Sequence, residues 1–421
     1  MPLDRLIRLF SSLRLTVVCL ALATILVFVG TLAQVTLGLY EVQARYFQSF
    51  FVYWNLPGTG IRIPVFPGGY LIGGVLLVNL AVAYTVRLGF RRVHTGLLLI
   101  HAGLVLLLLG QLWTDLSQRE SVMQLAEGQT KSYSESQRLT ELAVIAPSES
   151  GQEQVVAVPQ SRLRPGTELQ HPLLPFTVRV QQFWLNSAPL RGQTNVTPLA
   201  TRGIGQREQF VERPPVTTTD TRNVPAALIE IVGAEGSLGT WLVSDWLLEP
   251  QPVEYQGKTY SVALRLARYY KPFSITLLEA RHDKYMGTEI PRNFSSRVRV
   301  QHAVTGEDRE VLIYMNNPLR YGGFTFYQYQ MAADEVARRR QQRATSTLQV
   351  VQNPGWLVPY IACILVGLGL TLQFGTHLLA FARRRIRGTR HPAPEELIPS
   401  PAPRRSASPV LTATTTNLSR P

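Results

Sequence analysis

Cysteine is scarce in this chain of 421 residues, and its scarcity excludes several kinds of site. Only Cys19 and Cys363 occur, and both lie inside long apolar runs, where a thiol acts as a small buried side chain. Two such residues cannot build a disulfide framework, a C-x-x-C redox pair or a zinc site. The soluble part of the chain has no cysteine, so its apolar core must stabilise it.

Signatures of self-sufficient enzymes are also absent. The sequence has no G-x-S-x-G, no Walker loop, no H-E-x-x-H and no Rossmann fingerprint, and its acidic residues show no recognisable catalytic spacing. Acidic residues are themselves few: 28 Asp and Glu stand against 42 Lys and Arg, which gives a formal net charge of +14. Because no recognition motif accompanies this charge, we do not expect nucleic acid as a partner.

The arginines gather at the ends of apolar runs, which is typical of a membrane protein at the cytoplasmic surface. Four runs are long enough to cross a lipid bilayer as helices, namely residues 15–33, 68–86, 96–113 and 357–380. A secretory signal peptide is an alternative for the first run, but that run is long and lacks a clear A-x-A site. We therefore predict an integral membrane protein with four transmembrane helices.

The basic clusters also indicate the orientation, because the connector 87–95 and the stretch after residue 380 are rich in arginine and should face the cytoplasm. The predicted parts are a cytoplasmic N-terminus with the first helix (1–36), an extracytoplasmic aromatic loop (37–67), a helical hairpin (68–113), an extracytoplasmic β-rich domain (114–355), the fourth helix (356–380) and a cytoplasmic, basic and disordered tail (381–421). The aromatic loop should lie at the lipid headgroups, with a ligand platform as the alternative.

Short stretches that alternate in polarity predict that the large domain between the third and fourth helices is mostly β. They are residues 177–180, 227–232, 261–267, 297–300 and 311–314. Turn signals at Gly257-Lys258, Gly306-Glu307 and Gly322-Gly323 favour antiparallel meanders or sandwiches. Residues 187–225 are predicted to form a long exposed loop or a poorly ordered insertion, and 334–343 a solvated helix or turn.

Two histidines belong to the third predicted helix: His94 at its cytoplasmic mouth and His101 about two turns deeper. Seven residues turn a helix by nearly 700°, so both rings point to about the same face. A ring among leucines is unfavourable unless it faces protein, a cavity or a cofactor, and imidazole ligates haem iron and other transition metals. The alternatives are a hydrogen bond to a neighbouring helix for His101 and an ordinary interfacial position for His94. Without a C-x-x-C-H motif, the chain is not itself a cytochrome c.

These features together resemble the ResB-type (also called CcsB) cytochrome c biogenesis proteins of the System II pathway. SSLRLTVVCLALATILVFVGTLAQ resembles that family's first membrane segment, and GLLLIHAGLVLLLLGQLWT resembles its third. KYMGTEIPRNFSSRVRV and VLIYMNNPLRYGGFTFYQYQM resemble its most recognisable stretch, of which NPLRYGGFTFYQ is the specific part. The resemblance covers residues 12–380 in order and topology.

The resemblance implies a multi-pass protein of the bacterial inner (cytoplasmic) membrane that is a subunit of the System II cytochrome c synthase. Such a subunit assists haem transfer across the membrane and haem attachment to apocytochrome c, together with a CcsA-type partner that bears a tryptophan-rich segment. The six tryptophans here are scattered, so this chain lacks that segment. We expect a non-catalytic subunit of a haem lyase that binds haem b transiently. His101 matches the family's proposed ligand of the haem iron, and His94 is a candidate from its spacing alone.

Two other functions are compatible with the sequence. The chain can be a membrane scaffold or apocytochrome chaperone that binds the synthase partner without touching haem, in which case the histidines are packing groups. A sensor or transporter is disfavoured by the small number of helices and the missing signalling domain. For NPLRYGGFTFYQ, packing is the first interpretation and an aromatic surface for haem or apocytochrome is the second.

Overall fold

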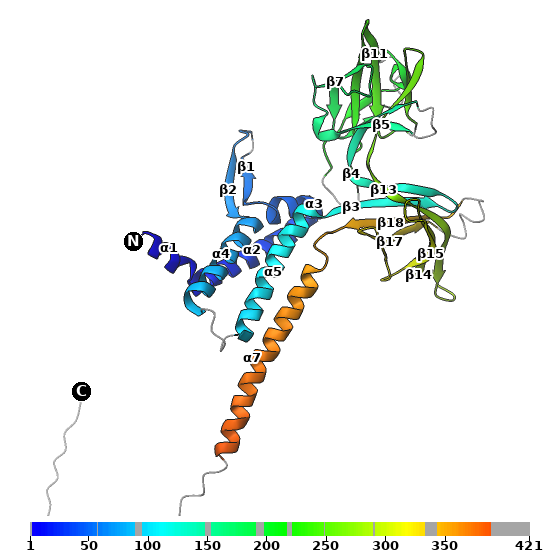
Figure 1. Cartoon of the computed structure of the whole chain (residues 1–421). Coiled ribbons are helices and arrows are strands. Elements are labelled where there is room, and N and C mark those ends of the chain that lie inside the picture. Colours follow the sequence, from blue (N-terminus) through cyan, green and yellow to red (C-terminus); the bar gives the residue numbers. More distant parts are fainter. Residues whose placement is uncertain are drawn as a thin grey trace, which may run out of the picture.

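A computed structural model describes residues 2–56, 58–88, 95–147, 153–190, 198–216, 221–247, 249–288, 291–332 and 343–388. It consists of a group of helices and a β domain that stands beyond one end of them (Figure 1). Within the described ranges, four helices are long and apolar enough to cross a membrane: Leu13–Leu37, Gly69–Val86, Thr95–Ser117 and Val358–Ile386. These helices and the large, mostly β domain fit a membrane protein, as the sequence predicts.

The helical elements are α1 (Pro2–Phe10), α2 (Leu13–Leu37), α3 (Leu39–Val42), α4 (Gly69–Ala83), α5 (Thr95–Ser117), α7 (Val358–Gly388) and the π-helical turns η1 (Gln43–Phe47) and η2 (Tyr84–Leu88). α5 ends four residues after the expected boundary at 113. α7 continues past residue 380 through the first four arginines of the basic cluster. The apolar run predicts the membrane-crossing part of a helix, but polar turns at either end extend it.

Asn79 joins the start of α2 to α4. Its side chain is 1% exposed, and its amide nitrogen donates to the carbonyl oxygens of Phe10 at 2.6 Å and Ser12 at 3.1 Å. The Asn79 carbonyl oxygen accepts a hydrogen bond from Thr16 Oγ1 at 2.6 Å. A polar group in an apolar segment is stable when it is paired in this way, so Asn79 fixes one end of α4.

Residues 37–67 contain more secondary structure than the predicted aromatic loop. After α3 and η1, strand β1 (Phe51–Asn55) pairs antiparallel with β2 (Arg62–Pro67). At the base of this hairpin, Gly68 and Gly69 lie directly against the chain before β1. A Cβ on Gly68 would collide with the Ser49 oxygen and one on Gly69 with the Phe47 oxygen, so only glycine fits there. The large exposed apolar side chains of the hairpin are Phe51, Tyr53, Trp54, Ile61, Ile63 and Val65.

The β domain follows α5 and precedes α7 in the chain. Its strands are β3 (Arg119–Ala126), β4 (Thr130–Ala146), β5 (Gln154–Pro159), β6 (Glu168–Leu169), β7 (Thr177–Trp184), β8 (Ser187–Pro189), β9 (Phe210–Glu212), β10 (Ala226–Gly233), β11 (Gly236–Ser244), β12 (Gln251–Tyr255), β13 (Lys258–Lys284), β14 (Pro291–His302), β15 (Glu307–Tyr314), β16 (Leu319–Tyr321), β17 (Phe324–Ala332) and β18 (Thr345–Gln352). Every pairing between these described strands is antiparallel, which confirms the predicted topology class.

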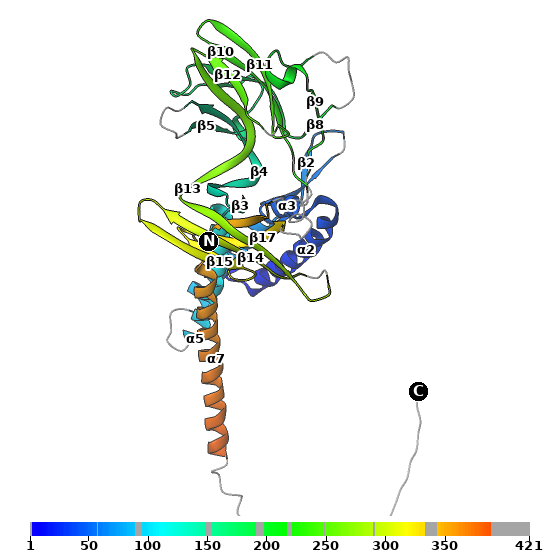
Figure 2. The ribbon, with the colours of Figure 1, turned by 90° about the vertical axis from the view of Figure 1, so that its right-hand side faces the viewer.

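Two lobes make up the domain, and β4 and β13 run through both (Figures 1 and 2). The proximal lobe, beside the helices, has the strand order β15-β14-β13-β4-β3-β18-β17-β16. Its buried core contains Phe326, Leu348, Ile275, Val298 and Ile313. The distal lobe packs the sheet β11-β10-β7-β6 against β5, β12 and the far ends of β4 and β13. Its core includes Leu142, Val144, Ile229, Ile231 and Val262.

The junction of the lobes is polar. The pairing of β4 with β13 changes register between Leu266 and Arg268 and again between Tyr270 and Ile275. Lys271 lies within the second of these shifts. It is 6% exposed and donates from Nζ to Ser134 Oγ at 2.6 Å and to the Tyr269 oxygen at 3.1 Å. Burial lowers the pKa of Lys271 to about 8, because a charged ammonium loses hydration there.

The five predicted strand stretches all lie within strands, and the three turn signals directly precede or join strands. The prediction of a long exposed loop at 187–225 is wrong for the described part of that segment. β8 and β9 pair there, and Ala200 and Phe210 are buried in a small core with Leu228 and Leu242. The prediction failed because the apolar residues of this core are widely spaced in the sequence and do not show the alternation that predicts strands. Residues 334–342, and 389–421 of the predicted tail, lie outside the described residues.

Two helices, α5 and α7, connect to the proximal lobe through the neighbouring strands β3 and β18. β3 begins two residues after the end of α5, and β18 ends six residues before α7. Gln352 at the end of β18 pairs with Arg119 at the start of β3. We call α5, β3, β18 and α7 the stem. α5 and α7 pack together, and each leads directly into one of the paired strands β3 and β18, so the stem connects the two helices to the β domain (Figure 1).

Candidate functional site

One face of α5 is made for close contact with α7. Gly96, Gly103 and Gly110 recur every seventh residue, which places them in one stripe. A Cβ on Gly103 would lie 2.8 Å from the Ala362 oxygen, and one on Gly96 would lie 2.9 Å from the Gly369 oxygen. Helices associate in lipid by close approach of their backbones at small residues. Burying apolar side chains adds little there, because lipid tails are as apolar as the side chains.

His101 lies on the opposite face of α5. It precedes Gly103 by two residues, which is about 200° around the helix. The ring is half-buried, and Nδ1 lies 2.7 Å from the Leu97 carbonyl oxygen one turn earlier. A carbonyl can only accept, so Nδ1 carries the proton and donates it. In the neutral ring, Nε2 is then the nitrogen without a proton, and its lone pair is the one available for coordination.

The face of α5 that carries His101 meets α4 at two places. The ring of Tyr84, which is 9% exposed, lies 6.3 Å from the His101 imidazole between ring centres, with 44° between the planes. Asp115 lies fourteen residues after His101 and so within about 40° of the same face. Its carboxylate accepts hydrogen bonds from Tyr70 of α4 and from Gln48. Hydrogen bonds and a ring contact thus join α4 to α5, where glycines join α7 to α5.

These residues suit a metal that brings most of its own ligands. Among the described residues, no group of three or more His, Cys, Asp and Glu could hold a metal ion. His101 offers a single imidazole nitrogen whose tautomer is fixed by a carbonyl, which is the usual arrangement behind a metal-bound histidine. Haem iron has four porphyrin nitrogens and takes axial ligands from protein. His101 could therefore hold a haem iron, whose remaining ligands would not have to come from the described residues.

His94, the other candidate ligand, lies outside the described residues. The other described histidines take part in local structure. His171 Nδ1 accepts from the Leu173 amide at 3.2 Å, and His302 Nδ1 accepts from the Thr305 amide at 3.2 Å. His282 stacks on Phe294 at 4.4 Å between ring centres, and Nε2 of His377 lies 3.0 Å from Gln373 Nε2.

The segment NPLRYGGFTFYQ, residues 317–328, forms β16, a turn and β17 around Phe273. The Phe273 ring has its centre 4.8 Å from that of Tyr321 and 6.2 Å from that of the fully buried Phe326. Gly322 has φ +58° and leaves room for Phe273. Arg320 lies 5.0 Å from the Trp356 ring at the entrance to α7. The structure therefore supports packing as the first purpose of this segment.

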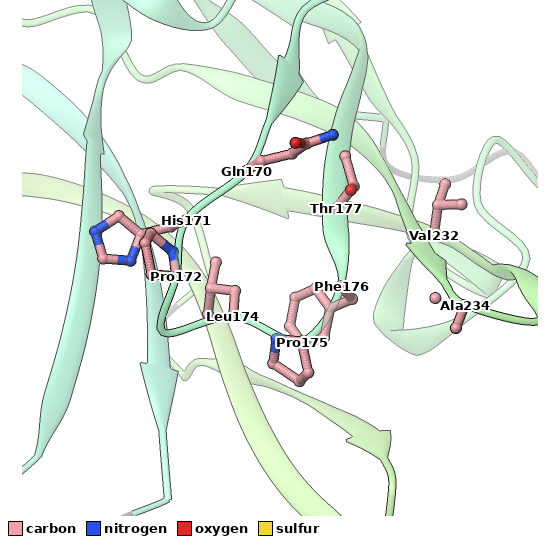
Figure 3. A pocket seen from close by; sticks show the side chains of 10 residues that line it. Gln170, His171, Pro172, Leu174, Pro175, Phe176, Thr177, Val232 and Ala234 are labelled. Atoms are coloured by element: carbon pink, nitrogen blue, oxygen red, sulfur yellow. The ribbon is translucent and has the colours of Figure 1, made fainter.

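A hollow of about 580 Å³ lies on the distal lobe, where the loop before β7 faces the end of β10. Pro175, Phe176 and Val232 are among its lining residues, and His171 stands on the side of the loop away from Val232 and Ala234 (Figure 3). The Phe176 ring packs edge-on against Tyr255 and Tyr260. Among the described residues that line this hollow, His171 is the only one with a titratable side chain.

The sequence did not point to the residues around His101. The Leu97 carbonyl is a backbone group, and Tyr84 and Asp115 become neighbours of the His101 face only through the packing of α4 on α5. The available signal was that each apolar run has few polar residues, and Tyr84 is one of them. A polar side chain in an apolar run needs a partner, so looking for a partner of Tyr84 would have led to the contact with His101.

Comparison with known proteins gives two matches. The ResB-like family model matches residues 253–340, which run from β12 through β17 in the β domain. Protein NrfI of Wolinella succinogenes is 32% identical over 99 residues, which are 24% of this chain. The match spans only 10% of that relative's length. The family match includes the NPLRYGGFTFYQ segment and leaves out α5 with His101.

Proposed function

We propose that the chain is a subunit of the System II cytochrome c synthase in the bacterial inner membrane, starting from the match of residues 253–340 to the ResB-like family and the similarity to Protein NrfI. In this role it assists haem transfer across the membrane and haem attachment to apocytochrome c with a CcsA-type partner. It is then a non-catalytic subunit of a haem lyase. The match of residues 253–340 to the ResB-like family carries the biogenesis role, and the 2.7 Å contact of His101 Nδ1 with the Leu97 oxygen supports His101 as the ligand.

The residues of the chain have separate tasks in this proposal. His101 would hold the iron of transiently bound haem b through Nε2, and the Leu97 carbonyl would keep the proton on Nδ1 and make the ring a better donor. Haem supplies the iron and its redox chemistry. Leucines of α5 exclude water around the ring, and the stem ties α5 to the outer domain, which receives apocytochrome c. His94 is a second candidate ligand by its spacing.

A second function, a scaffold or apocytochrome chaperone that does not touch haem, is favoured by a different observation. The ResB-like match lies wholly in the outer domain and does not include any membrane-spanning helix. If that domain alone carries the family's function, His101 is a packing group. Haem that co-purifies with the complex would then depend on histidines of the partner.

The full chain, co-expressed with its CcsA-type partner and purified in detergent, tests the first proposal. The variants are His101→Ala and, as a matched control, His377→Ala on α7. We expect His101→Ala to lose the haem absorption of this subunit and to reduce cytochrome c maturation, whereas His377→Ala retains both. An unchanged haem spectrum with intact maturation in His101→Ala would refute the role of His101 and leave the scaffold function.

A further inference from the structure

Tyr84 occupies the point at which α4 changes its geometry. α4 ends at Ala83, and the π-helical turn η2 begins at Tyr84. A π-turn widens the helix and changes the direction of the side chains that follow, and such turns are common at functional sites. Here the buried Tyr84 ring lies against the imidazole of His101 on the neighbouring helix, 6.3 Å away between ring centres.

The imidazole of a histidine needs outside contacts to hold its plane. Rotation about the Cβ–Cγ bond has a broad minimum, so the side chain alone does not fix the ring orientation. The Leu97 oxygen restrains the direction of Nδ1. The tilted Tyr84 ring lies beside the imidazole and restricts its rotation. Two contacts from different helices thus define both the direction and the plane of the ring.

The position of Tyr84 is itself well anchored. Asn79, five residues earlier on α4, is bonded to the Phe10 and Ser12 oxygens and to Thr16. At the other end of α4, Tyr70 donates to Asp115 of α5. α4 is therefore tied to the start of α2 near Tyr84 and to the end of α5 near Tyr70, so it holds the Tyr84 ring in place against His101.

We propose that Tyr84 is a positioning residue, whose ring sets the plane in which His101 presents Nε2 to the iron of a planar tetrapyrrole. This inference rests on the proposed function of His101. The aromatic ring of Tyr84 orients the imidazole, and the hydroxyl is not needed for this, because the ring is the part that lies against His101. Removing a partner that orients a metal-bound histidine weakens metal affinity by about 10-fold to 100-fold.

The experiment uses the full chain in detergent, titrated with haem, with bound haem examined by electron paramagnetic resonance and by its midpoint potential. Tyr84→Leu removes the ring, Tyr84→Met is a second variant of similar bulk, and Tyr84→Phe keeps the ring. Tyr360→Leu, an exposed tyrosine on α7, is the control. Thermal unfolding of each variant without haem separates a positioning effect from a general loss of structure.

We expect Tyr84→Leu and Tyr84→Met to bind haem about 10-fold or more weakly, with a changed resonance spectrum, and Tyr84→Phe and Tyr360→Leu to match the parent. Equal affinity and an equal spectrum in a folded Tyr84→Leu or Tyr84→Met variant, together with loss of haem in His101→Ala, would overturn the role of Tyr84 alone. Haem binding that His101→Ala leaves unchanged would instead overturn the proposed function.

Discussion

The two sides of α5 are built differently. Toward α7, three glycines bring backbones together, so that an added Cβ would clash with backbone or branched side chains. Toward α4, the contacts are the Tyr84 ring on His101 and the hydrogen bond of Tyr70 to Asp115. The first side holds the stem together by close packing, and the second carries the only described histidine of α5. One side of α5 thus joins it to α7 by close packing, and the other side presents polar groups that could hold a ligand without disturbing that packing.

The largest effect should come from filling the glycine face. In Gly103→Leu the side chain meets the Ala362 oxygen and Val366, so α5 and α7 must separate. We expect a loss of about 3 kcal/mol, the upper end for overpacking, and a lower yield of folded protein. Thermal unfolding in detergent measures it. Gly367→Leu on α7 is the control, because a Cβ there meets nothing within 4 Å; equal losses in both variants would contradict the comparison.

The pH dependence of the free energy of unfolding sharpens the comparison, because Lys271, the group that should cause it, lies in the β domain and not on α5. Lys271 has a pKa of about 8 in the folded chain and the ordinary value near 10.4 when unfolded. Between these values the unfolded chain binds more protons, so the free energy of unfolding should rise with pH from about 8 to about 10, by roughly 2 kcal/mol. Lys271→Met should lack this rise.

The same pH dependence distinguishes the two parts of the molecule. Gly103→Leu should lower stability by an equal amount at every pH and keep the rise, because Lys271 lies at the junction of the lobes. Denaturant unfolding of the three proteins between pH 7 and 10 measures it. A rise that persists in Lys271→Met would show that another group causes it.

A smaller effect is expected on the α4 side. Tyr70→Phe removes the hydrogen bond to Asp115 and leaves the ring, which packs on Phe50 at 5.9 Å between ring centres. A partly buried hydrogen bond of this kind contributes about 1 kcal/mol. Unfolding temperature, compared with Tyr360→Phe, measures the loss. A loss as large as that of Gly103→Leu would mean that α4 holds α5 as firmly as α7 does.

Much of the fold was predictable because single-residue patterns determine it. Apolar runs identified the four candidate spans, and alternation identified strands such as β7, β10 and β14. The division into two lobes was not predictable, because it depends on β13 crossing both lobes with two register shifts. The histidine face of α5 followed from helix periodicity. The contact with Tyr84 did not, because it depends on how α4 packs and on the π-turn η2.

The smallest effect on stability should be that of His101→Ala. The ring is half-buried and its hydrogen bond is local, to a carbonyl that already belongs to the helix. We expect a change within about 0.5 kcal/mol, as for substitutions away from a packed core. Thermal unfolding without haem measures it, with Leu104→Ala, an exposed position on α5, as the control. A loss of several degrees beyond that control would make His101 a packing residue.

The central claim is that His101 Nε2 binds haem iron, and pulsed electron paramagnetic resonance on haem-loaded chain with nitrogen-15 histidine tests it most directly. The account predicts a hyperfine coupling from a histidine nitrogen in the parent and in His377→Ala, and its disappearance in His101→Ala. A coupling of the same size in His101→Ala would contradict the account and assign the iron to another histidine.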